Sequence, residues 1–563
     1  MTQGALAGSS SILYAVVGAF IFIMISVGFA AKKFVKNSDD FNRGGGNVPW
    51  WVAGVSMYMG VFSAYSFVSF GSVVFTDGGI GILIGFGAVF SFAVAGLFFA
   101  HRWHRAALLT PVDYLERRFG PSARNFVAYA TIVMNASSSA LRLYAFALLM
   151  NGLTGAPVMP TIILAGIAMA LVATVGGLWG IVLADAVQFV VLLAGLIPLL
   201  ILSILKFGGW DAFVDFATTD MLAFDRGTRG WGWLMTWWMF QIIFGQISFP
   251  MIQRFASVPT EKDARKAAFL AAGLLIPTPF LALIPVAICF QLYPSVPPEQ
   301  AFAFIAKDVL PIGLLGLLVG SMIAATVSEL ETAFNIDSGI FTRNIYQRKF
   351  RPDASRAHLL WVARIATLVS AAVTIGFALL IAGSQTGIFN LSEAIGSRMI
   401  LALCIPFAAG VLIRRLSERG FLVTVFVGLA VSMSLWWAGW SPQDVRLPLV
   451  AAGLASLALG AVVFPPRGEE ANRVRAFFVQ ISTRLPTPET GQAAINTQTV
   501  RLVAVTIILM GFIPLVLPWI AATSGFGRVV EFGLAAVLFA FGTALLILGG
   551  SLSTNSTKGD SEP

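Results

Sequence analysis

Polar side chains that could hold a cation gather inside one apolar stretch, residues 316–335, which reads GLLVGSMIAATVSELETAFN. The stretch is long enough to cross a bilayer as a helix. Its polar members include Ser328, Glu329, Glu331, Thr332 and Asn335. Hydrocarbon offers a carboxylate no hydrogen bonds, so we expect these residues to face protein, water or an ion. The cluster therefore predicts a binding site or a path through the membrane, and it favours transport as the function.

The composition is that of a membrane protein. Of the 563 residues, 57% are hydrophobic and 11% are charged, against about 25% charged in a soluble domain. Apolar runs of about 20 residues recur along the chain, and we predict an all-α polytopic protein with about fifteen transmembrane helices. The expected spans are residues 11–33, 48–72, 78–101, 124–152, 157–176, 179–206, 231–252, 268–293, 310–336, 358–383, 386–413, 420–440, 447–465, 501–523 and 529–550.

The net charge of +9 does not point to a nucleic-acid partner. Most Lys and Arg residues lie in short loops between the expected spans, and they concentrate in alternate loops such as 102–118, 254–266 and 343–356. Such an asymmetry marks the cytoplasmic side of a membrane protein. We therefore predict a multi-pass protein of the inner (plasma) membrane, with the N-terminus outside and the C-terminus in the cytoplasm.

Two expected spans contain residues that interrupt a helix. The second contains Gly60 with Ser63 nearby, and the seventh contains Gly245 and Pro250. These spans open two successive groups of five, and broken helices at matching places favour an inverted-repeat transporter. Close helix packing at small residues would also explain the Gly and Ser content.

The chain divides accordingly into seven segments. They are an N-terminal span and loop (1–47), a first five-helix repeat (48–206), a second repeat (231–413), two further spans (414–465), a polar cytoplasmic connector (466–500), two C-terminal spans (501–550) and a disordered tail (551–563).

Five motifs in a fixed order resemble the sodium:solute symporter family, which includes the bacterial proline and sodium–galactose symporters. The motifs are FNRGG (41–45) with VPWW (48–51), TPVDYLERRFG (110–120), GGL (176–178) with Asp185 and Gln188, QR (253–254) with DARK (263–266), and the opening stretch with IY (345–346). The resemblance implies a LeuT-like bundle of two inverted five-helix repeats and sodium-driven uptake of a small organic solute by alternating access.

The resemblance also implies a cation site. The matching positions supply the carbonyls of Met59, Phe62 and Ala325 and the hydroxyl of Ser328. Asp185 matches an acid along the family's sodium exit route. The chain departs from the family at Glu329, which stands where a second hydroxyl is expected.

The departure at Glu329 leaves three roles open. A carboxylate is a hard ligand that could bind sodium in place of the missing hydroxyl. Desolvation could instead make it a proton site, which would give a proton-coupled carrier on the same fold. It could also form an internal ion pair with Arg142 or Arg398, which would give a cation-independent carrier.

The resemblance places the solute between the broken helices and the tenth core helix. The candidate solute-binding residues are Tyr65, Ser66, Gln241, Phe244, Ser392 and Glu393. Glu393 and Arg398 could grip an amino acid or a carboxylate, or could form a structural pair. The regions that match the acid and lysine of sugar transporters read LIGF (83–86) and AGLL (272–275), which makes a sugar a less favoured solute.

The sequence carries no zinc spacing, nucleophile elbow or nucleotide-binding signature. We therefore expect a transporter rather than an enzyme, with Na⁺ as coupling ion and no other cofactor. The sequence leaves the solute, the stoichiometry and the oligomeric state open.

Overall fold

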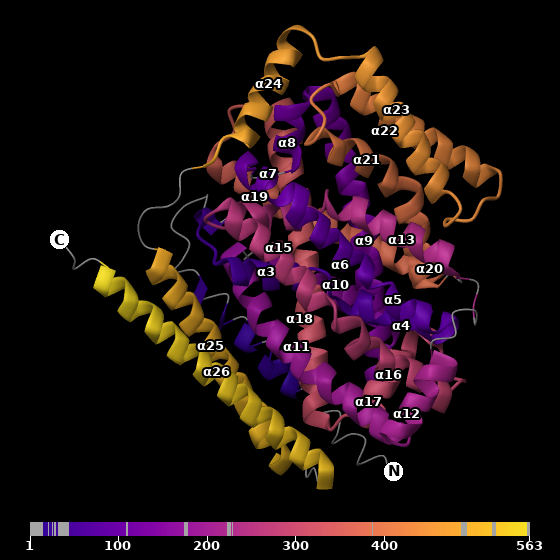
Figure 1. The fold of residues 1–563 in the computed structure, drawn as a ribbon, viewed down its shortest axis with the longest axis vertical. Coiled ribbons are helices and arrows are strands. Elements are labelled where there is room, and N and C mark those ends of the chain that lie inside the picture. The colour runs from indigo at the N-terminus through magenta and orange to yellow at the C-terminus, as the bar shows by residue number, and fades with distance from the viewer. Residues whose placement is uncertain are drawn as a thin grey trace.

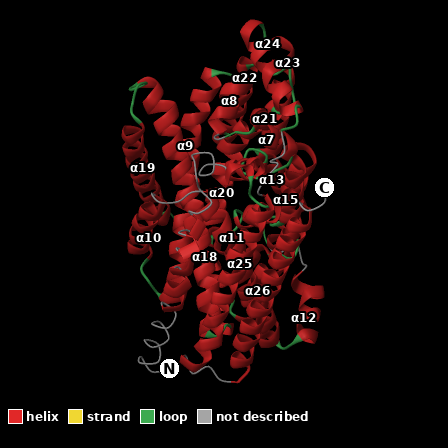
Figure 2. Ribbon diagram, turned by 90° about the vertical axis from the view of Figure 1, so that its left-hand side faces the viewer, coloured by secondary structure: helices red, strands yellow, loops and turns green. Residues whose placement is uncertain are grey.

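The computed structural model describes residues 15–20, 22–24, 26–27, 30–31, 44–108, 111–173, 178–221, 227, 229–384, 387–485, 492–520 and 525–559, and the regular structure in these ranges is helical throughout. The helices form one long bundle. Helices α7 (Ala100–Ala106), α8 (Pro111–Arg118) and α24 (Gly468–Ser482) gather at one end, and α12 (Trp210–Phe216) lies at the other (Figures 1 and 2).

The first half of the core begins with the broken pair α3 (Trp50–Met59) and α4 (Ala64–Asp77). It continues through α5 (Gly79–Leu83), α6 (Phe86–Val94), η3 (Ala95–Phe99), α7, α8, α9 (Pro121–Thr154), α10 (Val158–Ala173) and α11 (Leu178–Phe207).

The second half begins with another broken pair, α13 (Trp231–Gly245) and α14 (Phe249–Ser257). It continues through α15 (Glu261–Leu275), α16 (Thr278–Leu292), α17 (Ala301–Val309), α18 (Ile312–Gly339), η6 (Ile340–Gln347), α19 (Arg356–Ala382), α20 (Ile388–Ile395), η7 (Gly396–Ile400) and α21 (Leu401–Gly410).

The remaining helices surround this core. Helices α22 (Glu418–Trp437) and α23 (Arg446–Val463) pack against each other and against α21. Helices α25 (Gln492–Ile520) and α26 (Gly525–Gly559) form a hairpin at the edge of the bundle, where α25 contacts α11 and α18 (Figure 1).

The expected count of about fifteen spans is not confirmed. Within the described residues, 11 helices are long and apolar enough to cross a membrane, or up to 12 when α3 and α4 count as one bent span. The count falls because α10 has 16 residues and α13 and α14 have 15 and 9. The expected span 11–33 is described only in part.

Two of the predicted C-terminal segments contain helices in their described parts. The connector 466–500 contains α24 and the start of α25, so it is largely helical in its described part. Helix α26 continues to Gly559, so the tail expected to be disordered from residue 551 is helical up to that point. Residues 560–563 lie outside the described residues.

The break between α3 and α4 occurs where Gly60 and Ser63 predict it, and the two helices meet at a bend of 53°. Such a break exposes backbone groups that must find partners inside a membrane. The Ser66 hydroxyl donates to the carbonyl of Val61 at 2.7 Å. The amide of Ala64 donates to Thr326 Oγ1 at 3.0 Å. The break is therefore fixed by one side chain of α4 and one of α18.

The break between α13 and α14 depends on close contact with α6. The Gln246 amide nitrogen donates to the carbonyls of Ser91, at 3.1 Å, and Ile242, at 2.9 Å. A side chain at Gly245 would collide with Ser91 Oγ, so glycine permits the close approach of the two helices. Pro250 is the second residue of α14 and lies in its first turn, where its missing amide hydrogen breaks no bond within the helix.

Arg118 on α8 holds the end of α21. Its guanidinium is fully buried and donates to the carbonyls of Gly410, Ile413 and Leu416 at 2.8, 2.7 and 2.9 Å. These carbonyls lie at and beyond the C-terminus of α21, where helix carbonyls lack partners within the helix. The contact therefore ties the two halves of the core together at this end of the bundle.

We predict that Arg118→Met lowers the free energy of unfolding by about 3 kcal/mol, because hydrogen bonds from a charged donor are lost and buried carbonyls are left without partners. Thermal unfolding of the detergent-purified protein measures the change. The matched control is Arg117→Met at the exposed neighbouring residue, for which we expect a change within about 0.5 kcal/mol. Equal losses in the two variants would contradict this role for Arg118.

Glu116 on α8 makes a second connection at the same end. Its Oε1 lies 3.0 Å from Arg124 Nη1 on α9 and 2.7 Å from Arg348 Nη1 beyond η6. Burial raises the pKa of Glu116, but the hydrogen bonds and charges of Arg348 and Arg124 outweigh burial, and the pKa lies below the ordinary 4.5. Glu116 therefore stabilises the folded state fully above pH 4.5, and this contribution is lost as the pH falls through the folded-state pKa.

We predict that Glu116→Gln lowers the unfolding temperature at pH 7 and has a smaller effect as the pH falls below 4.5. Glu116 and Arg348 are 36% and 44% exposed, so the loss at pH 7 should not exceed about 1 kcal/mol. Melting curves at pH 7 and at low pH measure the difference. Glu116→Gln should destabilise the Arg348→Gln variant less than it destabilises the wild type. Fully additive stability losses in the double variant would contradict the pairing.

Candidate functional site

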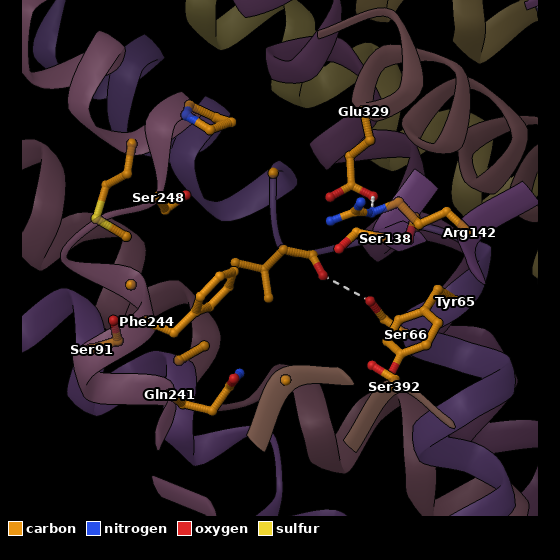
Figure 3. Close-up of a pocket in the computed structure, with 18 of the residues that line it drawn as sticks. Tyr65, Ser66, Ser91, Ser138, Arg142, Gln241, Phe244, Ser248, Glu329 and Ser392 are labelled. Carbon is orange, nitrogen blue, oxygen red and sulfur yellow. Dashed lines mark hydrogen bonds and ion pairs between the residues drawn. The ribbon is translucent and has the colours of Figure 1, made fainter. Parts of the chain in front are cut away.

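Two adjoining cavities lie between the broken helices. The central cavity, of about 220 Å³, is bordered by Ser63, Tyr65, Ser66, Ser138, Arg142, Gln241, Phe244, Glu329 and Ser392, among others (Figure 3). The second cavity has the same volume, about 220 Å³, and its border includes Met59, Asn135, Asp185, Ala325, Ser328 and Thr332. Residues of both breaks, Gly60, Ser248 and Pro250, border both cavities.

An ion pair lies in the wall that the two cavities share. Arg142 Nε on α9 lies 2.8 Å from Glu329 Oε2 on α18 (Figure 3). The two side chains are 29% and 17% exposed, and both border both cavities. The pair therefore faces the interior space of the bundle, where a membrane protein can accommodate charge. This contact is the internal ion pair that the sequence left open as one of three roles for Glu329.

The expected cation ligands come together only in part. Met59, Ala325, Ser328 and Glu329 border the second cavity. Phe62 borders instead a smaller cavity of about 40 Å³, and its ring packs against Tyr58 and Phe67. The amide of Phe62 donates to the carbonyl of Met59 at 3.0 Å. One lone pair of that carbonyl is thus engaged, and the other can still face a ligand.

The remaining polar residues of the opening stretch point in different directions. The Thr332 hydroxyl donates to the carbonyl of Ser328 at 2.9 Å and borders the second cavity. Glu331 is buried but borders neither cavity, and Asn335 is exposed. The expectation of one continuous polar cluster is therefore corrected, because a helix turns successive residues to different faces.

Asp185 on α11 belongs to a buried group at the edge of the second cavity. It accepts a hydrogen bond from the Ser56 hydroxyl of α3, and Arg254 Nη2 of α14 lies 3.5 Å from its Oδ2. Arg254 Nε also donates to Ser56 Oγ at 2.9 Å. Helices α3 and α11, from the first half of the core, therefore meet α14, from the second half, at one charged contact.

Five of the six expected solute-binding residues border the central cavity. Tyr65 and Ser66 come from α4, Gln241 and Phe244 from α13, and Ser392 from α20. In Figure 3, Tyr65, Ser66 and Ser392 lie on one side of the space, opposite Gln241 and Phe244. The structure thus brings hydroxyl, amide and aromatic groups together around one volume.

Glu393 is the exception, and its expected place is corrected. It accepts hydrogen bonds from Trp233 Nε1, at 2.7 Å, and from Arg446 Nη2. Arg446 is fully buried, its guanidinium lies 5.4 and 5.3 Å from the ring centres of Trp233 and Trp237, and it also donates to Ser397 Oγ at 3.0 Å. Glu393 therefore joins α20 to α13 and α23 rather than lining the central cavity.

The expected pairing of Arg398 is corrected as well. Its guanidinium lies 5.3 Å from the ring centre of Trp436, and Nη2 lies 3.4 Å from the carbonyl of Trp440. The π-helical turn η7 directs Arg398 toward α22, away from Glu329 and Glu393. The structural pair considered for Glu393 and Arg398 is not formed, because Glu393 pairs with Arg446 instead.

Several residues at the site were not expected from the sequence. Ser138 and Ser248 border both cavities, and so does Arg254. Ser138 lies four residues before Arg142, which places it on the same face of α9. The four-residue spacing from Arg142 could therefore have identified Ser138 from the sequence. No such pattern pointed to Arg254, because the basic residues that follow it indicated a loop.

Two broken helices whose breaks border the same polar cavities are typical of membrane transporters of the LeuT-like class. A solved structure of a Na⁺-coupled sialic acid symporter, in its substrate-bound outward-open state, superposes with a TM-score of 0.69 at 21% identity over 81% of this chain and 98% of that one. The structure of Mhp1, a nucleobase-cation-symport-1 family transporter, superposes with a TM-score of 0.52 at 16% identity, over 79% of this chain and 100% of that one. These similarities concern the fold.

The sequence comparisons identify the family. The sequence profile of the sodium:solute symporter family matches residues 41–428, and the chain belongs to this family. The chain is 24% identical to the sodium/sialic acid symporter SiaT of Proteus mirabilis over 436 residues, which cover 74% of this chain and 88% of that protein. It is also 24% identical to the sodium/glucose cotransporter of Vibrio parahaemolyticus over 479 residues, which cover 76% and 86%.

The protein is therefore a sodium-coupled secondary transporter, a multi-pass protein of the plasma membrane. The resemblance drawn from the five motifs is confirmed, and so is the LeuT-like class of fold.

We predict that Glu393→Gln and Arg446→Met each destabilise the protein by about 3–5 kcal/mol, because each leaves a buried charge without its partner. Thermal unfolding measures this loss. The matched control is Ser392→Ala at the neighbouring residue that borders the central cavity, with an expected loss below about 1 kcal/mol. A stable Glu393→Gln variant with impaired solute binding would contradict the structural role and restore Glu393 to the solute site.

Proposed function

We propose that this transporter carries a small polar solute with a carboxylate group, which binds in the central cavity with its carboxylate on Arg142. The proposal is carried by one observation: Arg142 borders the central cavity, and its side chain is 29% exposed. Arginine binds carboxylates through two parallel hydrogen bonds, which gives both orientation and affinity.

The charges at the central cavity support this assignment. Among the described residues that border it, the charged ones are Arg142, Arg254 and Glu329. Arg254 is 4% exposed and is held by Ser56 and Asp185, so it offers little to a solute. Arg142 is more exposed and has one carboxylate contact, with Glu329. It is therefore the cation best suited to receive a solute anion.

The remaining wall suits hydroxyl and amide groups on the solute. Ser66, Gln241 and Ser392 border the central cavity from three different helices, and Tyr65 and Phe244 add aromatic surface. The similar proteins agree with this chemistry, because two of them are sodium/sialic acid symporters and sialic acid is a polyhydroxylated carboxylate. These features together support the proposed solute class.

For the coupling ion, we propose a site at Ser328, Glu329 and the carbonyls of Met59 and Ala325, with the Phe62 carbonyl as a further ligand. The four that border the second cavity offer hard oxygens, which sodium prefers. Asp185 borders the same cavity and would lie on the route of the ion. Each sodium that enters contributes about 2.3 kcal/mol per 100 mV of membrane potential.

For the orientation, we propose that the N-terminus lies outside and the C-terminus in the cytoplasm, and that the structure resembles an inward-facing state. The second cavity extends along Val127, Thr131 and Asn135 of α9 toward the basic end of the bundle. At the other end, the Glu393–Arg446 contact packs with Trp233 and Trp237 over the central cavity. The charge of the loops supports the cytoplasmic assignment of the open end.

We predict that Arg142→Met reduces sodium-driven uptake of sialic acid into proteoliposomes by about 10- to 100-fold, as expected for loss of a charge-assisted hydrogen-bonded contact. The matched control is Arg398→Met, which removes a membrane arginine that contacts α22 instead of the cavity. A parallel thermal-shift screen compares carboxylates with uncharged sugars and amides in sodium and choline buffers. Stabilisation by uncharged compounds alone, or full uptake by Arg142→Met, would contradict the proposal.

A further inference from the structure

The Arg142–Glu329 ion pair occupies the place where both transported species are proposed to bind. Glu329 Oε2 lies 2.8 Å from Arg142 Nε, and both residues border the central cavity and the second cavity. Ser328, a proposed ligand of sodium, is the neighbour of Glu329 and borders the second cavity. Ser66 and Gln241, proposed contacts of the solute, border the central cavity. The ion pair thus separates the solute side from the cation side.

Because of this contact, Arg142 competes with sodium for Glu329, and Glu329 competes with the solute carboxylate for Arg142. A sodium ion that binds Glu329 must compete with the guanidinium of Arg142, because both are cations that need the same carboxylate. A solute carboxylate that binds Arg142 must compete with Glu329 in the same way. In this structure Arg142 and Glu329 therefore act as each other's counter-ions.

We propose that this ion pair is exchanged during transport: sodium replaces Arg142 at Glu329, and the solute carboxylate replaces Glu329 at Arg142. The inference rests on the proposed function, since it requires a solute that carries a carboxylate. In the empty site the two protein charges neutralise each other. In the fully loaded site, sodium neutralises Glu329 and the solute neutralises Arg142.

The two half-loaded states are the unfavourable ones. Sodium alone leaves Arg142 without an anion, and the solute alone leaves Glu329 without a cation. An uncompensated charge deep in a membrane protein is costly. Each ligand thus removes the cost that the other would meet, which makes their binding mutually cooperative, and this coupling is reciprocal by thermodynamic necessity. The exchange would couple the two fluxes without a contact between sodium and solute.

The surroundings of Arg142 allow the exchange. Both side chains are partly exposed to the cavities, 29% for Arg142 and 17% for Glu329, so neither is locked by packing. Figure 3 shows Ser138 beside Arg142 on the solute side, where its hydroxyl can accept a hydrogen bond from a displaced guanidinium. By contrast, Arg254 is 4% exposed and is bound to both Ser56 and Asp185.

Sodium binding in the absence of any solute tests the exchange. The dissociation constant for radioactive sodium is measured on the purified full chain and on two variants. Arg142→Gln removes the competing cation, and we expect it to bind sodium about tenfold more tightly than the wild type. Arg142→Lys keeps a cation and should stay close to the wild type. Unchanged or weaker sodium binding by Arg142→Gln would overturn the exchange.

A second measurement uses the wild-type protein and does not depend on how a variant folds. Butanedione modifies accessible guanidinium groups, and mass spectrometry resolves the rate at each arginine. Saturating sodium, compared with choline at equal ionic strength, should raise the rate at Arg142 about tenfold by releasing it from Glu329. The rate at Arg254 should not change. An unchanged rate at Arg142 would overturn the proposal.

The two proposals fail in different ways. If the solute carries no carboxylate, Arg142→Gln still binds sodium more tightly, but the screen finds no carboxylate that stabilises the wild type. If the exchange is wrong, carboxylates still stabilise the wild type, and the sodium affinity of Arg142→Gln does not rise.

Discussion

A carboxylate in the middle of a membrane bundle has to be neutralised, and in this protein Glu329 is neutralised by Arg142 across the space between α9 and α18. Neither charge could face lipid without a large cost. The space around them therefore has to stay open to polar groups, and the two cavities meet at this pair. The rest of the architecture can be understood as the means of keeping that space open inside an apolar bundle.

The broken helices make the space, and side chains on neighbouring helices stabilise the breaks. Ser66 and Thr326 bind the backbone groups freed between α3 and α4, and Gln246 does the same between α13 and α14. At one end of the bundle Arg118 ties α8 to α21, and at the other Arg446 ties α23 to α20. These polar interactions thus stabilise the helix arrangement, whereas the Arg142–Glu329 contact borders both cavities, where we propose that it changes its partners.

Much of the fold could be predicted from the sequence, because apolar runs and helix-interrupting residues are local signals. Gly60, Ser63, Gly245 and Pro250 lie where the helices break. The number of spans could not be predicted as well, since broken and short helices do not have the length of full crossings. The helix α24 was also missed, because its polar composition resembles that of a connector.

The site residues could be predicted where the position of a residue along a single helix decides whether its side chain borders the cavity. Ser66 and Ser392 border the cavity as expected. Partners far apart in sequence were not predictable: Glu393 binds Arg446, which lies 53 residues away, rather than the nearby Arg398. The choice between Arg142 and Arg398 as the partner of Glu329 likewise required the three-dimensional arrangement, since both are arginines within membrane helices.

The proposed coupling requires the Arg142–Glu329 contact to open when sodium and solute bind. An experimental structure with sodium and a carboxylate solute bound would measure the distance between Arg142 Nε and Glu329 Oε2, which is 2.8 Å in the present structure. We predict that the two atoms separate beyond hydrogen-bonding distance, with sodium on Glu329 and the solute on Arg142. An intact ion pair in the fully loaded protein would contradict it.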